Sequence, residues 1–318
     1  MQLRSFALPR PERVHAAAAL AGAAREGHEV ALNSMMRRRD ALSYELGLVR
    51  AEIEQFHILS LCGAQDEGQD VESYDGSLGV TRAFVDAHEK PIGQLQWLDD
   101  LPQRFNGAGE LPGLVSGVRF GSGALFQDDL FLTAGHCFDP VAGGFQAPSR
   151  NGIFIGPGEI AKVMQVNFDF QNAGSPPHAL RPGQSFPIVE LVENGLERGH
   201  VDYAIVRLGR NAAGQLPGEV FGTLTAAARD LRKAGATLCI IQHPSGGPKK
   251  IEAGPMLVNK GGRIRYTDLD TNNASSGAAI LSSAGEIVGV HTNGGCHLSG
   301  GSNFGQAIGA IRAASDII

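Results

Sequence analysis

The chain has 318 residues, of which 42% are hydrophobic and 19% are charged, and its formal net charge is −6. These proportions are typical of a folded protein and exclude a disordered chain. The acidic balance argues against nucleic acid or an anionic membrane as the main partner. Because no window approaches about 18 continuous apolar residues, we expect no transmembrane helix and no membrane partner.

The N-terminal region predicts helices. It has no apolar run followed by a small-residue cleavage site, so we expect no secretory signal and a cytoplasmic location. Residues 11–62 contain strong helix formers, and a helix over about 33–61 carries an apolar stripe at helical spacing, formed by Met35, Leu42, Leu46, Val49, Ile53 and Phe56. Two interpretations remain open: a helical hairpin that packs on its own body, or a regulatory segment that binds a partner or inhibits the site.

The pattern changes along the rest of the chain. Residues 63–90 are polar and acidic with several glycines, which predicts a linker with a short ordered piece near 78–85. Short apolar runs separated by turn residues then predict strands at 115–120, 124–126, 130–134, 153–155, 203–208, 238–241 and 287–291. Residues 307–318 predict a terminal helix. We therefore divide the chain into a helical extension with a linker (1–90) and an all-β domain (91–318).

The four cysteines are Cys62, Cys137, Cys239 and Cys296. Four cysteines can pair in three ways, and the sequence does not choose among them. No Cys-x-x-Cys pair occurs, so we expect no zinc site. The favoured interpretation is free, mostly buried thiols in a reducing compartment.

Three short motifs contain the residue types of a catalytic triad. They place His136 in Thr-Ala-Gly-His-Cys, Asp202 in Val-Asp-Tyr-Ala-Ile and Ser276 in Ala-Ser-Ser-Gly. A serine hydroxyl is a poor nucleophile unless a base lies within hydrogen-bond reach and a third group orients that base. Each motif alone would be weak, but three in this order predict a His-Asp-Ser triad.

The segment around Ser276 predicts the remaining catalytic groups. A polar loop, followed by the apolar run 278–281, would expose a hydroxyl beside backbone N–H groups. We expect the N–H groups of Ala274 and Ser276 to form an oxyanion hole for the developing negative oxygen. Ser275 is the rival nucleophile, and the glycine directly after Ser276 favours Ser276.

With these motifs the chain resembles the trypsin/chymotrypsin-fold serine proteases. Within them it is most similar to the bacterial glutamyl-endopeptidase-like branch, through the three motifs, Gln-His-Pro-Ser-Gly-Gly-Pro-Lys at 242–249 and Ile-Val-Gly-Val-His at 287–291. The similarity covers residues 91–318. It implies an all-β fold of two six-stranded barrels with the triad in the cleft between them, and an α-helical N-terminal extension lies outside it.

The chain departs from the family pattern at four positions. Ala274 stands where the family has glycine, which would better tolerate the backbone of the oxyanion hole. Ala279 replaces the usual proline or glycine, a change expected to be harmless. Gly121 replaces the usual cysteine partner of Cys137. Ser275 replaces the aspartate that pairs with a new N-terminus in trypsin-type zymogens, so we expect no activation of that kind.

The specificity residues give conflicting indications. Asp270 matches the residue that makes trypsin accept Arg or Lys, because a carboxylate pairs with a cationic side chain. His291 and Thr271 match the residues of glutamyl endopeptidases, which can hydrogen-bond a substrate carboxylate. We favour cleavage after Glu or Asp, with cleavage after Arg or Lys as the alternative. The simplest structural role of His291 would be a pairing with Asp270 inside the pocket.

The sequence therefore predicts a serine endopeptidase acting on protein or peptide substrates without a metal or organic cofactor. Two other functions remain open. A degenerate protease could serve as a binding module, an idea that Ala274 motivates and the intact triad opposes. An esterase could use the same catalytic groups.

Overall fold

The computed structural model describes residues 61–62, 66–141, 145–172, 184–297 and 300–318. The helices predicted within 11–62, and the partner-binding role considered for them, lie outside the described residues except for Leu61 and Cys62. Among the helices that are described, none has the length and apolar character needed to cross a membrane.

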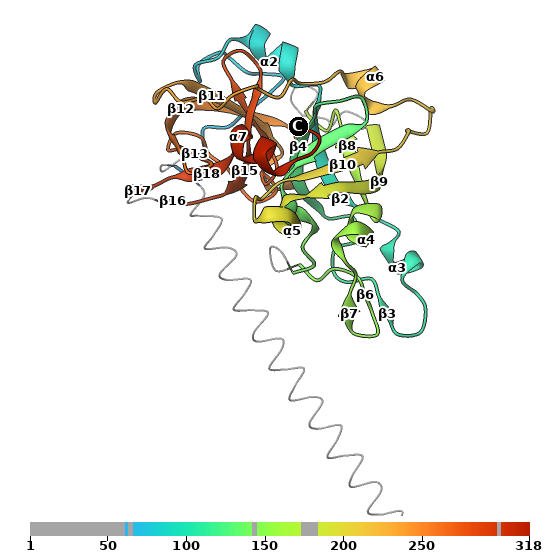
Figure 1. Ribbon diagram of the computed structural model, residues 1–318. Coiled ribbons are helices and arrows are strands. Elements are labelled where there is room, and N and C mark those ends of the chain that lie inside the picture. Colours follow the sequence, from blue (N-terminus) through green and yellow to red (C-terminus); the bar gives the residue numbers. More distant parts are fainter. Residues whose placement is uncertain (1–60, 63–65, 142–144, 173–183, 298–299) are drawn as a thin grey trace, which may run out of the picture. The chain divides into compact units, whose positions relative to one another are not determined.

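Six antiparallel strands form a closed barrel in the first half of the described chain (Figure 1). Their order around the barrel is β10-β5-β4-β2-β8-β9. The strands are β2 (Ile92–Trp97), β4 (Arg119–Leu125), β5 (Leu130–Thr133), β8 (Met164–Phe168), β9 (Gln184–Asn194) and β10 (Ala204–Leu208). The strands predicted at 115–120 and 124–126 correspond to the single strand β4, because residues 115–118 form a turn before it.

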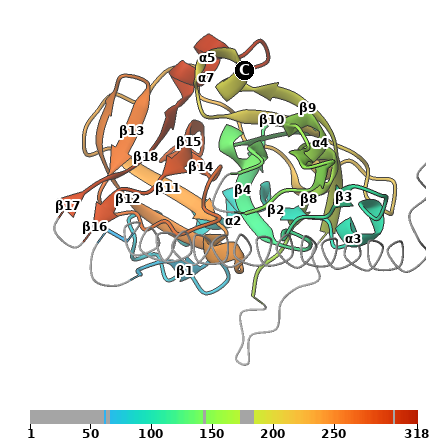
Figure 2. The same cartoon turned by 90° about the horizontal axis from the view of Figure 1, so that it is seen from below.

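A second barrel follows, and Figure 2 shows it beside the first. Its strand order is β12-β11-β14-β15-β18-β13, and pairing between β12 and β13 closes it. A further short strand, β1, pairs with the free side of β12. The strands are β1 (Gln69–Asp70), β11 (Thr237–Gln242), β12 (Lys250–Lys260), β13 (Arg263–Tyr266), β14 (Ala279–Ser282), β15 (Ile287–Asn293) and β18 (Asn303–Ala307).

An aromatic cluster fills the first barrel. Phe168 of β8 stacks on Phe221 at 4.7 Å between ring centroids and meets Phe131 and Phe186 edge-on. Gly93 of β2 makes room for these rings, because a Cβ at this position would lie 2.5 Å from Val166 and 2.9 Å from Phe168. The glycine thus lets the rings pack closely in the barrel interior.

Residues 66–90, where the sequence predicts a linker, are folded onto the second barrel. The segment carries β1 and helix α2 (Arg82–His88), and Val71, Tyr74 and Val85 are buried in the core. Lys249, which is fully buried, donates from Nζ to the carboxylate of Glu89 at 2.8 Å and to its carbonyl at 2.7 Å. A buried ion pair of this kind is costly to break from one side, so the segment is an integral part of this body.

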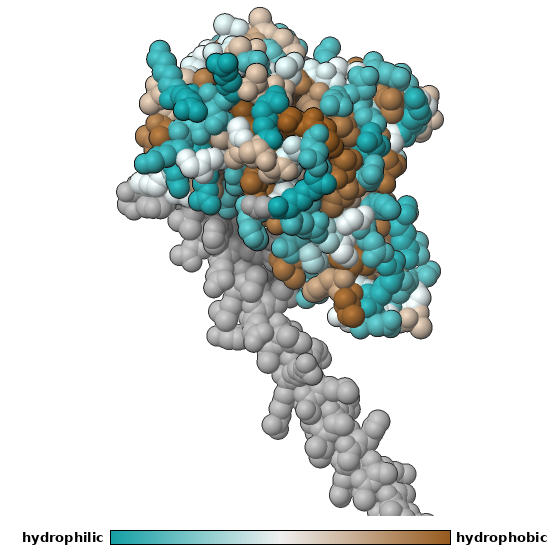
Figure 3. Space-filling model, viewed as in Figure 1, coloured by the Kyte–Doolittle hydropathy of each residue, from teal (hydrophilic) through white to brown (hydrophobic). Residues whose placement is uncertain are grey.

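The remaining elements are short. The helices are α3 (Leu101–Arg104), α4 (Pro157–Lys162), α5 (Gly195–Gly199), α6 (Pro217–Phe221) and α7 (Ile308–Ala314), and the 3₁₀ turns are η1 (Gly135–Phe138) and η3 (Pro244–Gly246). Two small sheets contain β3 (Glu110–Leu111), β6 (Ser149–Arg150) and β7 (Ile153–Phe154), and β16 (Cys296–His297) and β17 (Gly300–Gly301). Figure 3 shows apolar residues at the tip of the β3-β6-β7 sheet, where Leu111 and Ile153 are largely exposed.

The predicted terminal helix corresponds to α7. Ile308 and Ile311 are buried against the second barrel, as the helical spacing of the isoleucines predicts. Beyond the helix, the Ser315 hydroxyl and the Asp316 N–H donate to the Glu193 carboxylate at the end of β9. The C-terminus therefore connects the two barrels. The all-β double-barrel architecture expected from the resemblance is confirmed.

The interpretation of four free cysteines is wrong for two of them. Cys62 and Cys296 form a disulfide across 234 residues of sequence, whereas Cys137 and Cys239 are buried free thiols. Burial raises the pKa of both free thiols, which keeps them protonated and unreactive. The pairing could not be deduced from sequence because it depends on how residues 61–70 lie along the second barrel. The bridge also removes the support that four free thiols gave to a reducing compartment.

Candidate active site

His136 and Asp202 are paired at the end of the first barrel. The ring Nδ1–H of His136 donates to Asp202 Oδ2 at 2.7 Å, and the His136 backbone N–H donates to Oδ1 at 3.0 Å. The Asp202 side chain is 14% exposed. Burial by itself raises the pKa of Asp202, but the two hydrogen bonds from His136 outweigh it and hold the pKa below its usual value. The carboxylate is therefore ionised and fixes the orientation of the imidazole.

Glycines allow the elements that carry these residues to approach closely. A Cβ on Gly135 would lie 2.8 Å from Asn194 Oδ1, so only glycine lets η1 bring His136 against the start of β10. Gly277 has a φ of +88°, and a Cβ there would lie 2.0 Å from Thr133 Oγ1. The loop that carries Ser276 therefore rests directly on the strand end that leads into His136.

Ser122 of β4 holds the loop of Ser276 in place. Its backbone N–H donates to the Ser276 carbonyl and its hydroxyl donates to the Ala274 carbonyl, both at 2.8 Å. The Cys137 Sγ lies 4.0 Å from the same Ser276 carbonyl. These contacts place the loop that carries Ser276 against the segment that carries His136, although no direct hydrogen bond between the two side chains is made in the described chain. Sequence reasoning missed Ser122, because no local motif indicates a contact 152 residues away.

The loop leaves two backbone donors available for an oxyanion. The N–H groups of Ala274 and Ser276 donate to none of the described residues. Ala274 has a φ of +65°, the left-handed conformation that favours glycine. The departure from glycine at this position therefore strains the loop but does not close the predicted hole.

Ser275, the rival nucleophile, is fully buried. Its hydroxyl accepts a hydrogen bond from the Asn272 N–H at 3.1 Å, and its own N–H donates to the Asn272 carbonyl at 3.0 Å. Ser275 thus closes the loop on itself, whereas Ser276 is partly exposed. This geometry favours Ser276 as the nucleophile.

His291 lies beside the nucleophile loop. Its carbonyl accepts from the Gly277 N–H at 2.8 Å, and its ring Nδ1 is hydrogen-bonded to the buried Tyr266 hydroxyl. Burial lowers the pKa of His291 to about 3. The ring is therefore neutral at physiological pH. Tyr266 was not predicted from sequence, because its partner lies on another strand.

The other two predicted specificity residues are placed differently. Thr271 is buried, and its hydroxyl has no hydrogen-bond partner in the described part of the chain. The Asp270 carboxylate accepts from the backbone N–H groups of Cys62 at 2.6 Å and Glu67 at 3.2 Å. The structure therefore brings Asp270 to residues 62–67 and not to His291. The simple pairing of His291 with Asp270 does not occur.

Asp270 also lies close to Glu252 of β12, which is 1% exposed. Burial raises the pKa of Glu252 to about 9, and the negative charge of Asp270 adds to this effect. Burial raises the pKa of Asp270 as well, although its two backbone donors oppose the change.

Residues 121–290 match the family of the trypsin-like peptidase domain. The chain belongs to this family. The trypsin-like peptidase is thus a serine endopeptidase, as the sequence predicted, and its substrates are proteins or peptides. No curated protein matches its sequence.

Solved structures share the fold of the trypsin-like peptidase. A Glu endopeptidase is similar with a TM-score of 0.50 and 17% identity, over 79% of this chain and 96% of the other. The protease Deg5 is similar with a TM-score of 0.45 and 14% identity, over 73% of this chain and 90% of the other. At 17% identity, the likeness to the Glu endopeptidase establishes the shared fold alone.

Replacing Ala274 with glycine is expected to stabilise the trypsin-like peptidase. The left-handed conformation costs an alanine roughly 1–2 kcal/mol, and the flexibility of glycine offsets part of this gain. We expect the free energy of unfolding to rise by about 0.5–1 kcal/mol in urea titrations, with kcat/KM unchanged or higher. The control is Ala279→Gly, since Ala279 lies in β14 without a positive φ. Equal destabilisation by both substitutions would contradict the strain at Ala274.

The stability of the trypsin-like peptidase is expected to fall in mild acid. Burial lowers the pKa of both His243 and His291 to about 3, against about 6.5 in the unfolded chain. Below pH 6.5 the unfolded state binds protons that the folded state does not, so the free energy of unfolding falls as the pH decreases toward 3. Each ring lowers the free energy of unfolding by about 2 kcal/mol between pH 7 and pH 5, and Glu252, whose pKa burial raises to about 9, offsets part of this loss because it holds a proton in the folded state that it releases on unfolding.

Urea titrations of Ser276→Ala at pH 7 and pH 5 measure this loss without autolysis. Adding His243→Gln should remove about 2 kcal/mol of the acid destabilisation. His200→Asn should leave it unchanged, because His200 is exposed and its left-handed φ of +62° suits asparagine. If the free energy of unfolding of the His243→Gln variant differs between pH 7 and pH 5 by as much as that of its parent, the buried ring of His243 is not a cause of the acid destabilisation.

Proposed function

We propose that this serine endopeptidase cleaves after Glu or Asp, through a triad of His136, Asp202 and Ser276. The Ser276 hydroxyl attacks the peptide carbonyl while His136 Nε2 accepts its proton. Asp202 holds the Nδ1–H and stabilises the imidazolium that forms. His136 then protonates the leaving amine, and water repeats the sequence on the acyl-enzyme.

The negative oxygen of the tetrahedral intermediate would be bound by the N–H groups of Ala274 and Ser276. Both N–H groups are without a partner in the described chain, and Ser122 fixes the Ala274 carbonyl on the opposite side of the loop. Donors that are already oriented stabilise the developing charge without reorganisation. This arrangement supports an active enzyme over a degenerate binding module.

The observation that carries the acidic specificity is the neutral, buried His291 with Tyr266 on its Nδ1. When the Tyr266 hydroxyl donates to Nδ1, the proton of the ring is on Nε2, which becomes a donor. A hydrogen-bond donor in a buried pocket favours a carboxylate over an apolar side chain, and it offers nothing to a cation. The unpaired hydroxyl of Thr271 is a second donor of the same kind.

The alternative, cleavage after Arg or Lys, requires the Asp270 carboxylate in the pocket. That carboxylate accepts two backbone N–H groups from residues 62–67. A basic side chain would have to displace them or reach past them. The observations therefore favour the acidic substrate.

Digestion of a mixed peptide library by the full chain tests the proposal, with Ser276→Ala as the control. We expect cuts after Glu and Asp that disappear in the variant. Cuts after Arg or Lys would assign the pocket to Asp270, and cuts that persist in Ser276→Ala would reject the triad. If no cuts occur, the digestion is repeated with a chain beginning at Leu61. Cuts by this chain would show that the full chain is latent, and their absence would indicate a binding module. A chain beginning at Pro91 would not, because it lacks β1 and α2.

A further inference from the structure

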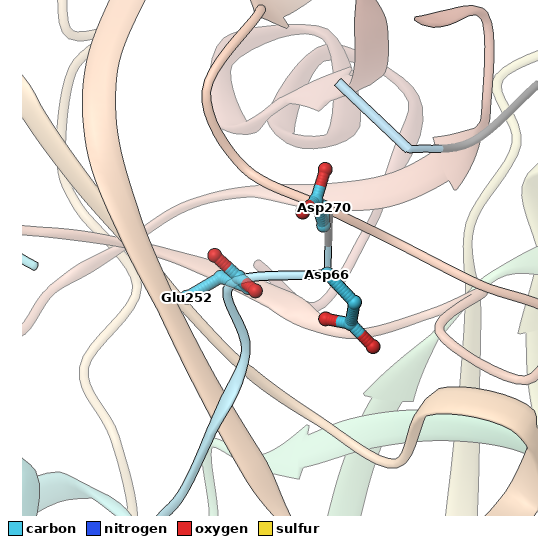
Figure 4. Close-up of side chains that lie close together, drawn as sticks. All are labelled: Asp66, Glu252 and Asp270. Carbon is cyan, nitrogen blue, oxygen red and sulfur yellow. The ribbon is translucent and has the colours of Figure 1, made fainter. Parts of the chain in front are cut away.

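Three carboxylates from distant parts of the chain converge behind the predicted specificity pocket. Asp66 precedes β1, Glu252 lies in β12 and Asp270 lies in the loop between β13 and β14 (Figure 4). One oxygen of each lies within 4.8 Å of the others. Asp66 is exposed, whereas Glu252 and Asp270 are buried. The cluster is therefore closed on the protein side and open to solvent at Asp66.

The Glu252 carboxylate is the unusual member of this cluster. The side chain is 1% exposed, yet neither oxygen has a hydrogen-bond partner within the described residues. Gly68 makes room for it, because a Cβ on Gly68 would lie 2.8 Å from Glu252 Oε1 and 3.0 Å from Asp66 Oδ1. A buried carboxylate without donors is costly unless a cation or a proton neutralises it.

Nearby positive groups do not neutralise Glu252. Lys250, on the same strand, lies 3.9 Å from Asp66 Oδ2 and donates to the Gly68 carbonyl, at the exposed side of the cluster. Asp270 is bound by backbone N–H groups alone, which leaves its charge in place. In the described chain, no ion pair involves Glu252 or Asp270.

We propose that Asp66, Glu252 and Asp270 bind a calcium ion. All three ligands are hard oxygen donors, which Ca²⁺ and Mg²⁺ prefer over softer metals. At about 2.3–2.6 Å from each oxygen, a Ca²⁺ ion spans ligands up to about 5 Å apart, whereas Mg²⁺ at about 2.1 Å requires a tighter, octahedral set. The separation within this cluster fits the larger ion, and water at the exposed side completes its coordination.

The ion would join two segments that form the floor of the pocket. Asp66 belongs to the segment that the Cys62–Cys296 disulfide ties to the second barrel, and Asp270 directly precedes Thr271. Calcium would therefore stabilise the loop before Ser276 from behind, without contact with the triad. The proposal does not depend on the proposed specificity, and its test needs no catalysis.

Calorimetric titration of the full-length Ser276→Ala chain with CaCl₂, after removal of divalent ions by a chelator, tests the site. We expect one saturable site with a Kd of roughly 10⁻⁵–10⁻³ M. At about 100-fold excess over the Kd, the melting temperature should rise by roughly 5–10 °C. MgCl₂ should bind at least about tenfold more weakly.

Two substitutions and one control identify the ligands. Glu252→Gln and Asp66→Asn should each weaken calcium binding at least about tenfold, while Glu286→Gln, an exposed carboxylate elsewhere on the second barrel, should leave it unchanged. If Glu252→Gln does not fold, Asp66→Asn still decides, because Asp66 is exposed. Absence of saturable calcium binding would overturn the proposal and assign a proton to Glu252. Unchanged binding in Asp66→Asn would overturn it as well.

Discussion

Replacing Asp202 with asparagine is expected to lower kcat/KM by about 10⁴-fold while leaving the protein folded. Asp202 accepts both the ring Nδ1–H and the backbone N–H of His136. An amide in its place can donate to Nδ1, which moves the ring proton to Nε2 and removes the base that faces Ser276. Initial rates on a Glu-containing reporter peptide measure the loss.

The matched control is Asp139→Asn, which lies three residues after His136 at the end of η1. Asp139 is exposed, and its carboxylate caps the Val141 N–H without contact with the imidazole. We expect its kcat/KM to stay within about threefold of the wild type, as is usual for surface substitutions. Activity of Asp202→Asn within tenfold of the wild type, with Ser276→Ala inactive, would show that His136 does not need this carboxylate.

The second large effect is expected at His291. Replacing it with valine should reduce the preference for Glu over Leu at the cleaved bond by about two orders of magnitude or more, since a buried hydrogen-bond donor discriminates strongly against a substrate that cannot use it. The substitution is best made in a Tyr266→Phe background, because valine alone would leave the buried Tyr266 hydroxyl unpaired at about 1–3 kcal/mol. Paired reporter peptides that differ only at this residue measure the ratio.

Tyr266→Phe alone is the control for the double variant. It removes the hydroxyl on Nδ1 but keeps the imidazole, so selectivity should fall less than in the double variant. If His291→Val leaves the selectivity unchanged, His291 does not recognise the acidic side chain of the substrate. A simultaneous loss of activity on Arg or Lys peptides in Asp270→Asn would then return the pocket to Asp270.

The sequence predicted strands that are continuous apolar runs and missed strands whose apolar residues are interrupted, such as β2, where buried Gln94 and Gln96 alternate with apolar residues. β10 and β11 are continuous apolar runs, which turn residues delimit clearly. β9 alternates buried Phe186 and Ile188 with exposed Pro187 and Val189, and β12 contains Gly254 and Pro255, so both resemble loops in sequence. The register of these strands depends on partners elsewhere in the barrel.

The residues of the site also divide into those that a local motif indicates and those that depend on distant partners. The triad motifs are local, because Gly135 and Gly277 adjoin His136 and Ser276, and β10 begins two residues after Asp202. The surroundings are not local: Ser122 supports a loop 152 residues away, and Tyr266 meets His291 from another strand. Asp270 is the clearest case. Its position in the sequence matches a residue of the specificity pocket, whereas its contacts with Cys62 and Glu67 depend on the path of the whole chain.

The Cys62–Cys296 bridge also governs what proteolysis can release. A cut upstream of Cys62 leaves Cys62 bonded to Cys296, with its N–H on Asp270. A single cut between the two cysteines yields two fragments that remain joined, so such a nick would be visible in electrophoresis only after reduction. Trimming of the N-terminus thus requires hydrolysis alone, whereas release of the segment that contains Cys62 requires both hydrolysis of a peptide bond after it and reduction of the disulfide by an electron donor.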